Sequence, residues 1–80
     1  MSKKVSRNEM TQFITQIAMD CGQTPLDSFC GKYINLMYDA NDRIMVESLE
    51  KNNTYGFTNI NDLSDKEIGN IYKSLLIDFG

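Results

Sequence analysis

The chain has 80 residues, of which 41% are hydrophobic, and it carries a formal net charge of −3 with a pI near 4.7. This length allows one small domain with little interior for a substrate cavity, and the apolar content is too high for a disordered chain. The negative charge disfavours non-specific binding to nucleic acid, and no apolar run in the sequence approaches the roughly 20 residues that span a bilayer.

We expect a single helical domain over residues 1–80, with a disordered tail at residues 1–4. The lysines of this tail are not followed by an apolar run, so we expect no secretory signal. The expected location of the protein is therefore the cytoplasm.

The first predicted helix covers residues 7–21. Ser6 and Glu9 have the spacing of a capping box, in which each side chain bonds the backbone N–H of the other residue. Gly22 is the residue type that ends many helices, because glycine adopts the left-handed backbone conformation without strain. The apolar residues that recur at helical spacing, and are expected to face the core, are Met10, Phe13, Ile14, Ile17, Ala18 and Cys21.

Residues 25–40 and 42–51 are predicted to form two further helices. Thr24 and Pro25 are typical of a helix N-cap and first helical residue, since proline lacks only an N–H group that would be unpaired there. Apolar residues then recur at helical spacing through both segments. Gly31 lies inside the first of these segments and weakens it as a helix by about 1 kcal/mol.

Two alternatives remain open for the middle of the chain. The apolar spacing continues across Asn41, so the two segments could form one long helix with a bend there. A β-hairpin that pairs residues 44–49 with residues 55–60 is the other alternative. We favour helices, because the segment from Glu47 to Lys51 has a higher helix propensity than strand propensity.

Residues 52–62 are predicted to be a loop, because they are rich in asparagine and contain a glycine. Tyr55 and Phe57 lie in this segment. Their aromatic rings are expected either to pin the loop onto the core or to anchor a partner, since exposed aromatic side chains often dominate the binding energy of an interface.

A last helix is predicted at residues 65–79, where Ser64 and Glu67 have capping-box spacing and Leu63 and Ile68 have the spacing of a hydrophobic staple. The predicted fold is therefore an all-α bundle of three to four helices. Its expected core contains Phe13, Ile17, Phe29, Ile34, Met37, Ile71 and Leu75.

The sequence offers no recognisable set of catalytic residues. It contains no histidine, which removes the commonest general base and every zinc site that uses histidine. Cys21 and Cys30 are too few for a structural zinc site and are expected to be buried, reduced thiols, with a disulfide between them as the alternative. We therefore predict no catalytic, cofactor or metal site, and a protein that is not an enzyme.

The segment from Ile17 to Pro25 resembles the turn of the helix-turn-helix family, with a small residue, Ala18, four positions before the turn glycine. The resemblance implies that a helix beginning at Pro25 enters the major groove of DNA. The same turn also occurs in a plain corner between two helices. The nucleic-acid-binding residues under this alternative are Lys3, Lys4, Arg7, Ser28 and Lys32.

Asp20 and Asp78 each lie in the last turn of a predicted helix, where the helix dipole disfavours negative charge. Such charges suggest a use outside the helix, for example against a basic partner. The predicted function is a small acidic interaction module that binds, and modulates or inhibits, a larger protein or nucleoprotein assembly. A structural homodimer is a second alternative. The predicted partner-binding residues are Asp20, Asp39, Asp42, Glu47, Glu50, Tyr55, Phe57 and Asp78.

The size, acidity and abundance of asparagine, isoleucine and lysine resemble those of small bacteriophage accessory proteins. Many such proteins inhibit host enzymes or defence systems, and anti-CRISPR proteins are among them. The resemblance implies an inhibitor that acts in the host cytoplasm and contacts a basic, nucleic-acid-facing surface of its target. It is a similarity of composition and involves no individual residue.

Overall fold

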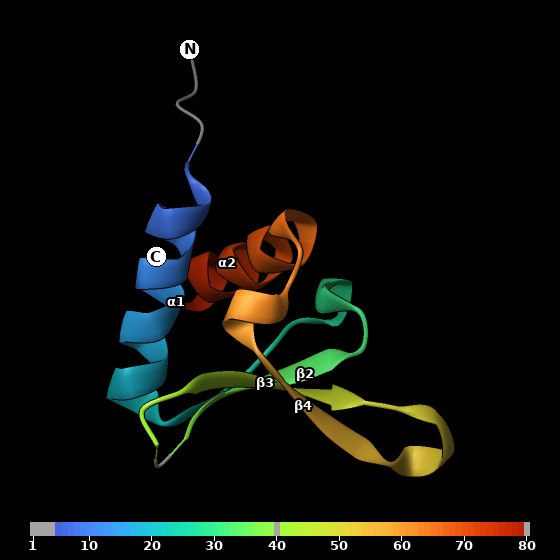
Figure 1. The fold of residues 1–80 in the computed structure, drawn as a ribbon. Coiled ribbons are helices and arrows are strands. Elements are labelled where there is room, and N and C mark those ends of the chain that lie inside the picture. Colours follow the sequence, from blue (N-terminus) through green and yellow to red (C-terminus); the bar gives the residue numbers. More distant parts are fainter. Residues whose placement is uncertain (1–4, 40, 80) are drawn as a thin grey trace.

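The computed structural model describes residues 5–39 and 41–79 and has an α+β fold (Figure 1). Two helices, α1 (Arg7–Cys21) and α2 (Asp65–Phe79), lie on one side of a four-stranded antiparallel sheet with the strand order β1-β2-β3-β4. The all-α bundle predicted from the sequence is therefore wrong.

The predicted tail at residues 1–4 lies outside the described residues. The remaining elements are β1 (Gln23–Pro25), β2 (Tyr33–Tyr38), β3 (Ile44–Leu49) and β4 (Tyr55–Asn59), with short 3₁₀ turns η1 (Ser28–Cys30), η2 (Lys51–Asn53) and η3 (Ile60–Asp62).

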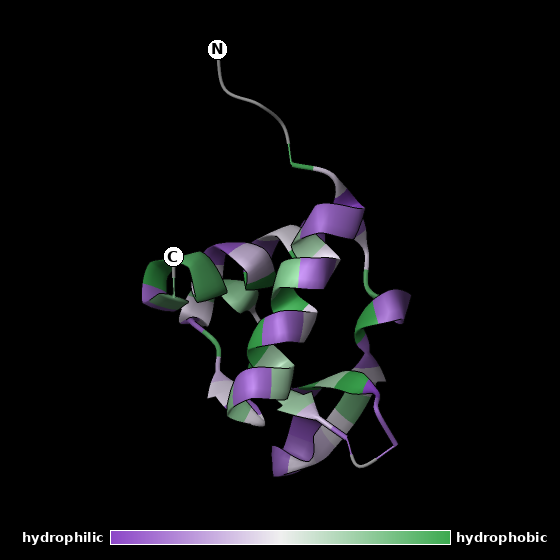
Figure 2. Cartoon of the chain, turned by 90° about the vertical axis from the view of Figure 1, so that its left-hand side faces the viewer, coloured by the Kyte–Doolittle hydropathy of each residue, from purple (hydrophilic) through white to green (hydrophobic). Residues whose placement is uncertain are grey.

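Both outer helices are confirmed at the predicted bounds. The Ser6 hydroxyl oxygen accepts a hydrogen bond from the backbone N–H of Glu9 at 3.2 Å, which caps α1. Gly22 ends α1 with a φ of 75°, a backbone conformation that favours glycine. Hydrophilic and hydrophobic segments alternate along α1, as expected for a helix with one buried face (Figure 2).

The helices predicted at residues 25–40 and 42–51 are wrong, because their described residues form β1, η1, β2 and β3. A tight turn reverses the chain after β2. The backbone N–H of Asp39 donates to the Arg43 carbonyl at 2.8 Å, and that of Asp42 donates to the Asp39 carbonyl at 3.0 Å. Asp42 has a φ of 62°, which aspartate tolerates better than most residues and which interrupts any helix. The alternative of one long helix is wrong for the same reason.

The β-hairpin that we considered as an alternative is the structure that this part of the chain adopts. Strands β3 and β4 pair antiparallel in an unbroken register. Residues 52–62, which were expected to form a loop, therefore contain β4 and η3. The chain reverses at η2, where Asn52 and Asn53 have φ values of 62° and 59°. Asparagine is one of the few non-glycine residues that adopts this conformation readily.

A bulge in β2 decides which face of the sheet Tyr33 occupies. Two steps along β2, from Tyr33 to Asn35, correspond to a single step along β3, so Ile34 is an extra residue. Side chains alternate along a strand, and without the bulge Tyr33 would lie on the same face as Asn35. With the bulge, Tyr33 turns toward α2, where its hydroxyl donates a hydrogen bond to Glu67 Oε2 at 2.8 Å.

Glu67 connects this tyrosine to the start of α2. Its Oε1 atom accepts the backbone N–H of Ser64 at 2.9 Å, and its own N–H donates to Ser64 Oγ at 3.2 Å, which completes the predicted capping box. These bonds, first the one from the Ser64 backbone and then the one from Tyr33, lower the pKa of the Glu67 carboxyl. Burial, followed by the contact with Glu67, raises the pKa of Tyr33 to about 12. One carboxylate therefore ties the helix cap to the sheet.

The core fills the space between the helices and the sheet. The rings of Phe13 and Tyr72 pack edge to face between α1 and α2, with centroids 5.3 Å apart. The prediction of Phe29 as a core residue is wrong, because its ring is exposed, and Met37 lies on the face of the sheet that turns away from the helices. The buried apolar residues are Ile14, Ala18, Cys30, Tyr33, Leu36, Ile44, Val46, Ile60, Leu63, Ile68, Ile71 and Leu75.

The two cysteines lie in different environments. Cys30 is buried, with its sulfur 3.5 Å from the Asn70 carbonyl oxygen, and burial raises the pKa of its thiol. Cys21 is exposed, so its predicted burial is wrong. Both thiols are free, and the disulfide considered as an alternative is not formed.

None of the helices in the described part of the chain combines the length and the apolar character that crossing a membrane requires.

Replacing Tyr33 with phenylalanine should lower the free energy of unfolding by about 1 kcal/mol. The ring keeps its packing, but the hydrogen bond to Glu67 is lost. Denaturant unfolding would measure the change. Tyr72→Phe is a matched control, because the same atom is removed from a half-buried ring that packs on Phe13, and its effect should stay within about 0.5 kcal/mol. Equal effects of the two variants would contradict this role of Tyr33.

Acid should remove the stabilisation that Glu67 supplies. Its pKa in the folded chain lies below the ordinary value of 4.5, so the stabilisation is fully present above pH 4.5 and is lost as the pH falls through the folded pKa. In Glu67→Gln the amide oxygen replaces only one of the two accepting oxygens, so the variant loses one accepted hydrogen bond at neutral pH, but its side chain does not titrate. Unfolding measured between neutral pH and about pH 3 should therefore show a smaller loss of stability in this variant. An unchanged pH dependence would exclude Glu67 as a source of the acid sensitivity.

Candidate functional site

The two faces of the sheet have different environments. Leu36 and Val46 are opposite each other in β2 and β3 and are fully buried beneath the helices. Their neighbours along each strand point the other way, because side chains alternate. We call this second side of the sheet the open face. Its residues in β2, β3 and β4 are Asn35, Met37, Met45, Glu47, Leu49, Tyr55, Phe57 and Asn59.

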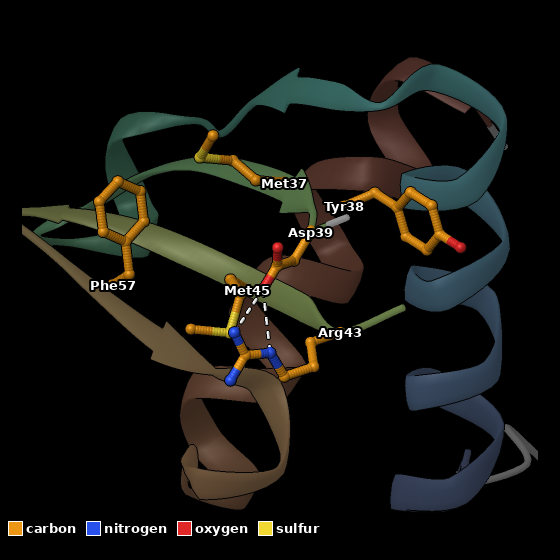
Figure 3. A pocket seen from close by; sticks show the side chains of 6 residues that line it. All are labelled: Met37, Tyr38, Asp39, Arg43, Met45 and Phe57. Atoms are coloured by element: carbon orange, nitrogen blue, oxygen red, sulfur yellow. Dashed lines mark hydrogen bonds and ion pairs between the residues drawn. The ribbon is translucent and has the colours of Figure 1, made fainter. Parts of the chain in front are cut away.

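A hollow of about 410 Å³ lies on the open face. Figure 3 shows Met37 from β2, Met45 from β3 and Phe57 from β4 around it. Met37 and Met45 are opposite each other in the register and are half-buried, whereas Phe57 is 55% exposed. Methionine side chains are flexible and polarisable, so this hollow can adapt to the shape of an apolar group.

An ion pair lies at one end of the hollow. The guanidinium of Arg43 contacts Asp39 Oδ2 through Nη2 at 2.7 Å and through Nε at 2.9 Å (Figure 3). Both residues belong to the turn that joins β2 to β3, and their backbones are also hydrogen bonded. Tyr38 also lines the hollow, but its side chain points away toward α1 and its hydroxyl donates to the Asp42 carboxylate. This hydrogen bond is the main cause that raises the pKa of Tyr38.

Glu47 lies in the middle of the open face. Its cross-strand neighbours are Asn35 and Phe57, and its Oε1 atom accepts a hydrogen bond from the Asn35 side-chain amide at 2.8 Å. Among the described residues no cation forms an ion pair with Glu47. At the end of β3, by contrast, Glu50 forms an ion pair with Lys32, whose Nζ atom lies 3.7 Å from Glu50 Oε1. The open face thus contains one carboxylate that accepts a hydrogen bond from a neutral amide.

Four of the eight predicted partner-binding residues lie on or beside the open face. Glu47, Tyr55 and Phe57 belong to it, and Asp39 lies at one end of it. Glu50 follows β3, but its carboxylate accepts a hydrogen bond from Ser48 Oγ at 3.1 Å, and Ser48 is buried on the side of the sheet that faces the helices.

The other three predicted residues lie elsewhere. Asp42 accepts the Tyr38 hydroxyl, and Asp20, at the end of α1, accepts the side-chain amide of Gln16 at 3.0 Å. Asp78 lies in the exposed last turn of α2 beside Ile77, where hydrophobic residues also reach the surface (Figure 2). These three residues do not join the hollow.

The residues of the predicted DNA-binding surface do not form one. Pro25 lies in β1 and Ser28 in the 3₁₀ turn η1, so residues 23–38 contain no helix that could enter a groove. Lys3 and Lys4 lie outside the described residues. Arg7 forms an ion pair with Asp65, in which Nη1 lies 2.7 Å from Oδ1, and Lys32 forms a longer ion pair with Glu50. The helix-turn-helix geometry implied by the sequence is therefore wrong.

Sequence reasoning missed Met37, Met45, Asn35 and Arg43. The methionines were assigned to helical positions, because a helix and a buried strand both produce closely spaced apolar residues. The signal that could have found them is the turn after Tyr38. Aspartate and asparagine are typical turn residues, and here they separate two runs of apolar and aromatic residues of strand length.

The side chains of the open face can contact another molecule, and they do not form a catalytic set that we recognise. Across residues 5–39 and 41–79, no three acidic or cysteine side chains are placed to hold a metal ion. The prediction that the protein is not an enzyme stays a prediction.

Comparison with known proteins adds no assignment. No protein-family model matches the chain, and neither a curated protein nor a solved structure shows significant similarity to it.

Proposed function

We propose that the chain is a small interaction module that binds a larger protein, or a nucleoprotein assembly, through the open face. The observation that carries the proposal is the position of Met37, Met45 and Phe57 on a side of the sheet that neither helix covers. A sheet face that is never covered usually carries polar side chains, because antiparallel sheets alternate between an apolar and a solvated side. This face instead carries Met37, Met45 and Phe57 around the hollow, with Leu49 and Tyr55 further along the strands.

Such a distribution of side chains is typical of a binding site between proteins. Interfaces have an apolar centre, enriched in aromatic residues and methionine, surrounded by a polar rim. Here Met37, Met45 and Phe57 form the apolar part of the hollow, and the polar Asp39–Arg43 pair borders it. Phe57 is suited to be an anchor, because an exposed ring has a large area to bury and little conformational freedom to lose.

Glu47 supports a partner that brings a basic side chain to this face. Burying the carboxylate without a cation would cost free energy, whereas a lysine or arginine opposite it would form a charge-assisted hydrogen bond. The net charge of −3 also favours a basic partner, because it attracts a positively charged surface at long range.

Modulation or inhibition of the partner needs no further chemistry from this chain. A protein that covers a functional surface of its target blocks that surface by occupancy alone. The anti-defence inhibitors to which the composition is similar are one form of this class, and the open face is the part of the chain that we assign to target binding.

The most direct test replaces Met45 with glutamate. This residue lines the apolar part of the hollow, so the new carboxylate would remove an apolar contact and would have to be desolvated on binding, which should weaken binding at least about tenfold. Affinity capture from a lysate of the source organism, or of its host, should recover one stoichiometric protein with the native chain. Binding of that protein to both chains is then measured by calorimetry.

Ile77→Glu is the matched control for this test. It makes a similar change at a residue that is 68% exposed on α2, away from the open face, and should leave the affinity unchanged. Equal binding by the native chain and Met45→Glu, or a loss of binding only with Ile77→Glu, would show that the open face is not the binding site.

Replacing Glu47 with glutamine tests the charge of the partner. The variant keeps an oxygen that accepts the Asn35 amide, so the sheet is undisturbed. Loss of the ionic contact should weaken binding several-fold and reduce its dependence on salt concentration. If affinity and salt dependence were both unchanged, the partner would have no basic side chain opposite Glu47.

A further inference from the structure

The two edges of the sheet differ in how they are protected against pairing with another strand. At one edge, β1 has three residues and contains Pro25, which lacks an N–H group. At the other edge, β4 has the five residues Tyr55–Asn59, with no proline, no charged residue and no break in its register with β3. Figure 1 shows β4 at the margin of the sheet. Natural proteins usually protect such an edge.

The register determines which backbone groups of β4 point outward. The Glu50 N–H donates to the Thr54 carbonyl at 2.8 Å, so this pair is one of the hydrogen-bonded pairs of the antiparallel ladder. Hydrogen-bonded pairs recur at every second residue, which directs the backbone groups of Gly56 and Thr58 toward β3. The N–H and C=O groups of Tyr55, Phe57 and Asn59 therefore point to the open edge.

These outward groups form a self-complementary set. They occupy the first, third and fifth positions of β4, symmetrically about Phe57. An antiparallel copy of the same strand, related by a two-fold axis beside Phe57, would place Tyr55 opposite Asn59 of the second copy and Asn59 opposite Tyr55 of the second copy. Every outward backbone group would then have a partner, as a two-fold interface requires.

We propose that two copies of this chain associate through their β4 edges, antiparallel and centred on Phe57, to form one continuous sheet of both copies. The side chains favour this occupant over an unrelated strand. Tyr55 and Phe57 are 59% and 55% exposed and lie on the same side of β4. Pairing about Phe57 makes the two Phe57 rings direct cross-strand neighbours, with each Tyr55 ring diagonal to the Phe57 ring of the second copy.

The charges beside β4 also match a second copy. Lys51 precedes the strand and Asp62 follows it, and both are exposed. Antiparallel pairing brings the start of one β4 beside the end of the other, so Lys51 approaches the side of the second copy that carries Asp62. This gives two attractive contacts, one on each side of the axis.

Dimerisation does not depend on the proposed function. It would join the open faces of two copies into one surface and leave Met37 and Met45 uncovered, since these residues lie on β2 and β3. The experiment below contains no partner protein, so its failure and the failure of the proposed function can be told apart.

Sedimentation equilibrium of the native chain over about a hundredfold range of concentration should show a monomer–dimer equilibrium. Phe57→Lys should raise the dimer dissociation constant at least about tenfold, because two like charges would meet at the axis. The fold should survive, since the new lysine faces Glu47 within its own chain. Ile77→Lys makes the same change on α2 and should leave the dissociation constant unchanged. A native chain that is monomeric at every concentration would overturn the proposal.

Amide hydrogen exchange identifies which surface forms the dimer. Exchange at Tyr55 and Phe57 should slow as the concentration rises, because their N–H groups become hydrogen bonded across the edge. Lys51→Asp should weaken the dimer, and the double variant Lys51→Asp with Asp62→Lys should restore it. A dimer in which these amides exchange at the monomer rate would be formed by another surface, and would equally overturn the proposal.

Discussion

Both helices pack on the same face of the four-stranded sheet, and this arrangement leaves the other face of the sheet uncovered. The covered face receives Leu36 and Val46 from the strands and the buried residues of α1 and α2. A few hydrogen bonds also join α2 to the sheet and to the segment that follows β1. Glu67 caps α2 and accepts the Tyr33 hydroxyl, while Ser74 of α2 accepts the backbone N–H of Asp27 at 3.0 Å. Because both helices pack on one side of the sheet, Met37, Met45, Tyr55 and Phe57 on the other side remain accessible to solvent.

The two surfaces that we propose for contact, the open face and the open edge, meet at Phe57. Its ring lies on the open face beside Glu47, and its backbone points out of the edge. A chain of 80 residues buries a smaller fraction of its surface than a larger domain, so covering these groups with a partner or a second copy adds apolar burial that the fold cannot supply itself. Within residues 5–39 and 41–79, no second layer of structure covers this face.

The sequence predicted the ends of the chain well and its middle poorly, for physical reasons. In α1 and α2, capping residues and helical periodicity indicate the same element, and the predicted bounds are the observed ones. Between them, Ile44–Leu49 begins with three apolar residues, which fit a helix or a strand equally well, and the helix propensity of the residues from Glu47 onward favours the wrong element. The bulge at Ile34 could not be foreseen, since it depends on the pairing of β2 with β3. Tyr55 and Phe57 were recognised as candidate anchors, but Met37 and Met45 required the sheet to be known.

The claim that the open face is the contact surface is tested most directly by the methyl signals of methionine in nuclear magnetic resonance. A soluble paramagnetic probe broadens methyl groups that solvent reaches. In the free chain it should broaden Met37 and Met45, and also Met19, which is exposed on α1. In the complex with the captured partner, Met37 and Met45 should become protected while Met19 stays broadened. Protection of Met19 with no change at Met37 and Met45 would contradict the account.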